Sequence, residues 1–186
     1  MAQQVENKLV MVDEFEEFIA LPENRVRLLE LVNGEIVEKM PTEEHGAIAS
    51  KCHGEIYIFL KQNPIGRLTI EARYRPKDDQ YNDRLPDVSF TSAERALPLV
   101  KKGAVPQMPD LAIEVKSPDD TYKEMREKAA FYLANGARMV WLVYPEKRMV
   151  EVYRLDADID ILTNGDVIDG ADVLPGFTLA ISDMFN

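Results

Sequence analysis

The sequence is short of cysteine and has no long apolar run. Cys52 is the only cysteine among 186 residues, which excludes an intrachain disulfide and a zinc site built from cysteines. We interpret Cys52 as a packing residue. No apolar run approaches the roughly 20 residues that a membrane-spanning helix needs. Residues 1–11 lack the basic segment and apolar core of a secretory signal. We therefore expect a cytoplasmic protein with no membrane partner.

Basic residues are also scarce. The chain has 22 lysines and arginines against 33 aspartates and glutamates, which gives a net charge of −11. Proteins that bind phosphate backbones usually carry a basic patch, so this balance counts against nucleic acid as a partner unless a local cluster compensates. Residues 73–77 (RYRPK) are the best local candidate for a phosphate contact. The composition is otherwise typical of a globular protein, and the length fits one domain spanning 1–186.

Hydrophobic periodicity and turn residues predict a mixture of helices and strands. Asn33-Gly34 suits a two-residue β-hairpin turn, and Thr121 with Glu124 forms a capping box that begins a helix. We predict helices at 12–20, 43–62 and 122–135, a hairpin over 26–39, and strands at 67–75, 85–91, 110–115, 138–144, 149–155 and 159–163. This order predicts an α/β fold with a mixed β-sheet flanked by helices, preceded by an N-terminal helix and hairpin.

The strand at 110–115 carries charged residues where a buried strand is expected. Side chains alternate between the two faces of a strand, so Glu114 and Lys116 are same-face neighbours, about 6–7 Å apart. The carboxylate can hold a hard divalent ion, and the ammonium can orient or deprotonate a water or stabilise charge on a phosphoryl oxygen. A surface salt bridge on an edge strand explains this local pattern equally well.

Asp87 is the candidate for a second metal carboxylate. Magnesium binds through one or two carboxylates together with substrate phosphates, and a second carboxylate would have to come from a neighbouring strand. Asp87 opens the strand at 85–91, so Asp87 and Glu114 would supply the pair. The alternative is that Asp87 is a turn residue after proline.

Several stretches, in order, resemble the Uma family of bacterial proteins classed as restriction endonucleases, within the PD-(D/E)XK nuclease superfamily. They are PDVSF, PDLAIEVKSPDD, KAAFYLANGARMVWLVYP and LPGFTLAISDMF, preceded by LELVNGEIVEKMP and HGAIASKCHGEIYIFLKQ. The resemblance covers nearly the whole chain. It implies a restriction-endonuclease-like core in which Asp87 matches the PD aspartate and Glu114-Val115-Lys116 the (D/E)XK element. It also implies Mg²⁺ or Mn²⁺ as cofactor.

The chain departs from the family at the catalytic lysine. Family members often have an apolar residue where this chain has Lys116, so the lysine could instead be Lys128, from the helix at 122–135. We favour Lys116, because the sheet fixes its position, whereas the reach of Lys128 depends on how the helix packs. The alternative for Lys128 is a solvated helix lysine.

Further polar residues have two interpretations each. Glu30 and Glu44 are additional acidic candidates for the site, but we prefer to interpret both as surface charges. His45 is either a site residue or, as we prefer, a helix-start histidine facing the core. Trp141 and Tyr132 are assigned to the core or to an interface.

Two functions remain open. The first is a metal-dependent endonuclease that acts on DNA, for which a homodimer is expected because enzymes that cut both strands are commonly twofold and closed symmetry is the general rule. The second is a non-catalytic oligomeric binding or regulatory domain on the same fold, favoured by the net charge of −11. Like charge slows approach to DNA. A positive cleft around the carboxylates would favour the endonuclease.

Overall fold

The computed structural model describes residues 8–186; residues 1–7, part of the stretch searched above for a secretory signal, lie outside the described residues. A six-stranded sheet has the strand order β3-β4-β5-β6-β7-β8. Its strands are β3 (Gly66–Ile70), β4 (Val88–Ser92), β5 (Leu111–Val115), β6 (Met139–Tyr144), β7 (Met149–Arg154) and β8 (Asp160–Leu162). β5 and β6 are parallel and all other neighbours are antiparallel. The predicted mixed sheet is confirmed.

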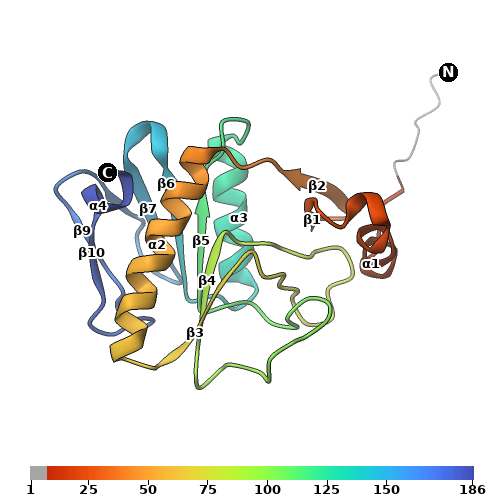
Figure 1. Ribbon diagram of the computed structural model, residues 1–186, viewed down its shortest axis with the longest axis horizontal. Coiled ribbons are helices and arrows are strands. Elements are labelled where there is room, and N and C mark those ends of the chain that lie inside the picture. The colour runs from red at the N-terminus through yellow and green to blue at the C-terminus, as the bar shows by residue number, and fades with distance from the viewer. Residues whose placement is uncertain (1–7) are drawn as a thin grey trace.

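Helices cover both faces of this sheet (Figure 1). Helix α2 (Glu43–Gln62) lies on one face and α3 (Tyr122–Ala134) on the other. Helix α3 connects the two parallel strands, which cannot be joined by a tight turn. The predicted capping box of Thr121 and Glu124 is present at its start. Both helices have the predicted bounds to within one residue. No helix among residues 8–186 is long and apolar enough to cross a membrane.

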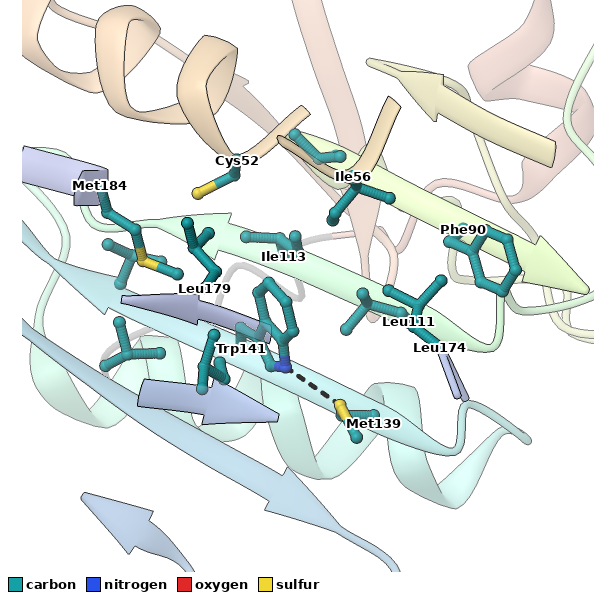
Figure 2. Close-up of a cluster of buried hydrophobic side chains, with 14 of the residues drawn as sticks. Cys52, Ile56, Phe90, Leu111, Ile113, Met139, Trp141, Leu174, Leu179 and Met184 are labelled. Carbon is teal, nitrogen blue, oxygen red and sulfur yellow. Dashed lines mark hydrogen bonds between the residues drawn. The ribbon is translucent and has the colours of Figure 1, made fainter. Parts of the chain in front are cut away.

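The larger core lies between α2 and the sheet, as Figure 2 shows. Ile48, Cys52 and Ile56 of α2 pack against alternate residues of β4 to β7. Trp141 is fully buried there, and its indole N–H donates to Met139 Sδ over 3.0 Å. Burial raises the pKa of the Cys52 thiol to about 12, so this cysteine is an unreactive packing residue, as predicted.

The C-terminal segment completes this core with elements that the sequence did not reveal. They are β9 (Val167–Asp169), β10 (Thr178–Ala180) and α4 (Ile181–Phe185). β9 and β10 form a separate antiparallel pair, and α4 contacts α2. Three-residue strands and a five-residue helix are too short to show a recognisable periodicity.

The N-terminal helix and hairpin are confirmed. Helix α1 (Val12–Ala20) is followed by a 3₁₀ turn, η1 (Pro22–Asn24), and by strands β1 (Leu28–Val32) and β2 (Glu35–Lys39). Asn33 and Gly34 both have positive φ, 51° and 82°, as a type I′ turn requires. A second 3₁₀ turn, η2 (Pro145–Lys147), joins β6 and β7.

The region 71–77 differs from the prediction in two ways. The strand expected to reach residue 75 ends at Ile70, because Glu71 adopts a left-handed conformation with φ 47° that cannot continue a strand. The basic cluster expected to contact phosphate is already engaged: Arg73 and Arg75 each form ion pairs with Glu16 and Asp83. These arginines tie α1 to the loop before β4.

Candidate functional site

Asp87 and Glu114 lie opposite one another at the ends of adjacent strands. β4 and β5 are antiparallel with Val88 paired to Ile113, which places Asp87 across from Glu114. Asp87 Oδ2 accepts a hydrogen bond from the Val115 N–H over 2.7 Å. The two residues are only 5% and 1% exposed. The pair named from the sequence therefore forms one buried acidic centre.

The ammonium of Lys39, at the end of β2, joins these two carboxylates. Lys39 Nζ donates to Asp87 Oδ1 over 2.6 Å, to Glu114 Oε2 over 3.2 Å and to the Leu85 carbonyl over 2.9 Å. Burial alone would lower the pKa of Lys39, but the negative charges of Glu114 and Asp87 outweigh it and raise the pKa. Lys39 is therefore a buried cation.

His45, in the first turn of α2, contacts the other side of Asp87. Its Nε2 lies 3.1 Å from Asp87 Oδ2, and its backbone N–H is capped by Thr42. Burial would raise the pKa of Asp87, but Lys39 and His45 outweigh it and hold the pKa well below its usual range. His45 is buried, as preferred from the sequence, but it also contacts the acidic centre.

Helix α3 contributes two side chains, one turn apart, to Glu114. The Tyr132 hydroxyl donates to Glu114 Oε1 over 2.7 Å, and Lys128 Nζ lies 3.5 Å from Glu114 Oε2. The Lys128 side chain is 14% exposed, so the interpretation of Lys128 as a solvated lysine is wrong. Burial would lower the pKa of Lys128, but the charges of Glu114 and Glu30 outweigh it and raise the pKa.

Glu30, on β1, is a third buried carboxylate. Its Oε1 accepts a hydrogen bond from the Leu85 N–H over 2.7 Å. Its Oε2 lies 4.0 Å from Lys128 Nζ and has no hydrogen-bond partner among residues 8–186. Glu30 is 1% exposed, so its interpretation as a surface charge is wrong. Glu44, in contrast, is exposed, as expected.

Lys116 extends away from the acidic centre. Its Nζ donates to the Ser117 carbonyl over 3.1 Å, lies 3.8 Å from Glu146 Oε1 and sits 5.6 Å from the centre of the Tyr122 ring. Within residues 8–186, the ion pairs of Asp87 and Glu114 are formed with Lys39, His45 and Lys128 and do not include Lys116. Alternation placed Lys116 beside Glu114, but β5 ends at Val115 and the rule applies only within the strand.

Two adjoining depressions open onto these residues. The narrower one is lined in part by Lys39, His45 and Asp87. The wider one is lined in part by Lys116, His45 and Ser117. His45 and Ser117 line both depressions, so the two are neighbours; Asp87 lines the narrower one and Lys116 the wider one, while Glu114 lies behind them.

The donor set suits a hard cation. Among residues 8–186 no group of three His, Cys, Asp or Glu side chains is arranged to hold a metal ion. Asp87 and Glu114 nevertheless supply two carboxylates, and the Lys39 ammonium between them marks a position that accepts positive charge. Magnesium is commonly bound through one or two carboxylates, with waters or substrate phosphates as its other ligands. Two carboxylates in this arrangement therefore fit Mg²⁺ or Mn²⁺.

Lys39 is a site residue that sequence analysis missed, and Tyr132 was expected only in the core or at an interface. The Asn33-Gly34 turn fixes the hairpin register, in which Leu28 pairs with Lys39 and Glu30 with Val37. Residues that pair across an antiparallel ladder share a face, so Glu30 and Lys39 lie on one face of the hairpin. Opposite charges on one face of a hairpin were the available signal.

Comparisons with known proteins identify the family and agree with the fold. The chain matches the model of the Uma2 family, described as "Putative restriction endonuclease", over residues 15–182. Among solved structures it is similar to the crystal structure of "a putative nuclease belonging to DUF820 from Anabaena variabilis ATCC 29413". That similarity has a TM-score of 0.78 at 27% sequence identity and covers 95% of this chain and 97% of the other. No match was found among the curated proteins.

Proposed function

Because the chain belongs to the Uma2 family of restriction-endonuclease-like proteins, we propose that it is a metal-dependent endonuclease that hydrolyses phosphodiester bonds in DNA. The observation that carries the proposal is the buried pair of Asp87 and Glu114 at the ends of adjacent strands. Burial of two carboxylates is costly unless cations compensate it. The pair is therefore suited to hold a cation, and Asp87 lines the narrower depression beside it.

Asp87 and Glu114 would hold Mg²⁺ or Mn²⁺. When bound, such an ion supplies positive charge that lowers the pKa of a water and stabilises charge on phosphoryl oxygens. The Val115 N–H and the Tyr132 hydroxyl each bind one carboxylate oxygen. They fix the orientation of the two carboxylates and leave Asp87 Oδ1 and Glu114 Oε2 directed at the cation position, where Lys39 now lies.

Lys128 is the lysine that the geometry favours for the reaction. Its Nζ lies 3.5 Å from Glu114 Oε2, and its raised pKa keeps it protonated at neutral pH. A protonated ammonium in this position stabilises negative charge on the phosphate and orients the attacking water, and does not act as a base. Lys116 lines the wider depression, and we propose that it contacts a neighbouring phosphate of the DNA. We therefore propose Lys128 as the catalytic lysine in place of Lys116, which the sequence favoured.

A non-catalytic oligomeric binding or regulatory domain is the second candidate. It is favoured by the net charge of −11 and by the engagement of Arg73 and Arg75 with acidic partners. Affinity for DNA would then depend on a small number of basic side chains. Strong, salt-sensitive DNA binding with Mg²⁺ present would remove the objection from charge, and DNA cleavage would exclude this candidate.

Cleavage of supercoiled plasmid DNA with Mg²⁺ or Mn²⁺ tests the proposal. We expect the wild type to nick or linearise the plasmid and Glu114→Gln to be at least ~100-fold slower. Glu94→Gln is the matched control, because Glu94 is an exposed carboxylate outside the site. No cleavage by the wild type with either ion, or equal rates for wild type and Glu114→Gln, would refute the nuclease.

We propose further that the protein acts as a homodimer, because two phosphodiester bonds on opposite strands are most simply reached by two sites related by a twofold axis. Light scattering on a gel-filtration column measures the mass directly. The expected result is twice the 21.2 kDa of the chain. A monomer that linearises plasmid DNA would contradict it.

A further inference from the structure

Lys39 occupies the position in which the proposed metal ion would be bound. An ammonium has three N–H donors and no acceptor, and the three oxygens around Lys39 Nζ, from Asp87, Leu85 and Glu114, match those donors at 2.6, 2.9 and 3.2 Å. We propose that Lys39 is a tethered cation that competes with the divalent ion for Asp87 and Glu114, so that the ion binds only when Lys39 leaves. This inference rests on the metal-dependent nuclease proposed above and concerns the control of its site.

The two cations exclude one another by size and by charge. Magnesium binds carboxylate oxygens at about 2.1 Å. An ion at that distance from both Asp87 Oδ1 and Glu114 Oε2 would overlap the Lys39 ammonium, which lies between the same two atoms. Two like charges in contact repel strongly in a buried site. Lys39 and the metal ion are therefore alternative occupants of one position.

The surroundings allow Lys39 to leave without unfolding the hairpin. Lys39 is the last residue of β2, and the next residue, Met40, is 72% exposed. The narrower depression is lined by both Lys39 and Glu71. The flexible four-carbon side chain would turn its ammonium away from the two carboxylates and along that depression toward water, while the strand stays in place.

Lys128 is close to the same carboxylate but does not occupy this position. Its Nζ approaches Glu114 Oε2 at 3.5 Å and Glu30 Oε2 at 4.0 Å, and it makes no ion pair with Asp87 within the described residues. Removing either lysine deletes one positive charge beside Glu114. Only removal of Lys39 empties the cation position, so Lys128→Met is the matched control for a general effect of charge.

Titration calorimetry with Mn²⁺ alone is the first test. We expect Lys39→Met to bind Mn²⁺ at least about tenfold more tightly than the wild type, because the fraction of molecules with an open site rises. The gain should exceed that of Lys128→Met. Equal gains in the two variants, or an affinity of Lys39→Met within about twofold of the wild type, would overturn the competition. The absence of Mn²⁺ binding in both wild type and Lys39→Met would do the same.

A second test uses the wild type and covers the case in which Lys39→Met does not fold without metal. Lysines are labelled with an acetylating reagent with and without Mg²⁺, and each site is quantified by mass spectrometry. We expect Mg²⁺ to increase the labelling rate of Lys39 several-fold and to leave that of Lys128 nearly unchanged. A Lys39 rate that stays constant or falls would overturn the inference.

Neither test depends on DNA cleavage. A protein that binds Mn²⁺ in competition with Lys39 but does not cut DNA would refute the proposed nuclease and leave the competition standing. A protein that cuts DNA with Mg²⁺ and shows no effect of Lys39 in either test would keep the nuclease and refute the competition.

Discussion

Tyr132 donates its hydroxyl hydrogen to Glu114 Oε1 over 2.7 Å and thereby joins the last turn of α3 to the end of β5. Burial and the charge of Glu114 raise the pKa of Tyr132 well above its usual value, so the phenol remains a donor. The bond fixes one oxygen of Glu114 and leaves the other directed at Lys39. Tyr132 is thus a positioning residue for the acidic centre.

Tyr132→Phe should weaken metal binding as well as the fold. It leaves a buried carboxylate oxygen without its donor, which typically costs about 1–3 kcal/mol in the free energy of unfolding. Urea denaturation measures this loss, and Mn²⁺ titration calorimetry measures the affinity. Tyr153→Phe is the control, because Tyr153 donates to Glu151 over 2.8 Å outside the site. Both variants should lose stability, but only Tyr132→Phe should lose Mn²⁺ affinity; equal affinities would show that Tyr132 is purely structural.

Lys128 and Lys116 should differ in which kinetic constant they affect. We expect Lys128→Ala to lower kcat about 100-fold or more while Mn²⁺ binding persists, because an ammonium cannot be a metal ligand. Lys116→Ala should mainly raise KM for DNA, since its Nζ lies near Glu146 and away from Glu114. Steady-state cleavage of a short duplex separates the two constants. Full activity of Lys128→Ala, with activity gone in Lys116→Ala, would reverse the assignment.

The stability contributed by Asp87 should depend on pH in the acid range. The folded-state pKa of Asp87 is lowered, so its contribution is fully present above the unfolded pKa of about 3.9 and is lost as the pH falls through the folded pKa. At pH 7, with a chelator present, Asp87→Asn should cost up to about 3–5 kcal/mol in the free energy of unfolding, since it removes the nearer of the two carboxylates that pair with Lys39 and leaves only Glu114. The difference from wild type should shrink below about pH 4.

Asp158→Asn is the control for that measurement, because Asp158 is exposed. Its difference from wild type should stay small at every pH. A deficit of Asp87→Asn that is as large at pH 3 as at pH 7 would contradict the ionised, paired Asp87.

Most of the fold could be predicted because its signals are local. Asn33-Gly34 determines the hairpin turn, and the apolar stripe of α2 and the cap of α3 determine helix bounds. The end of β3 could not be predicted, because the left-handed conformation of Glu71 depends on its surroundings in the folded chain.

The same difference between local signals and contacts made only in the folded chain applies to the site. Asp87 and Glu114 could be placed from strand alternation and the resemblance to a nuclease family, since Asp87 directly precedes β4 and Glu114 lies on the neighbouring β5. The approach of Lys39 and Lys128 to these carboxylates could not be predicted, because it depends on how the hairpin and α3 pack against that sheet. No local pattern fixes the distance between segments so far apart in the chain.

The central claim is that Asp87 and Glu114 bind one divalent ion, and anomalous X-ray scattering from a crystal grown with Mn²⁺ tests it most directly. The account predicts a peak within about 2.6 Å of a carboxylate oxygen of each residue, with Lys39 Nζ withdrawn from both. A manganese-containing crystal with no peak between Asp87 and Glu114, and with Lys39 Nζ still bridging them, would contradict it.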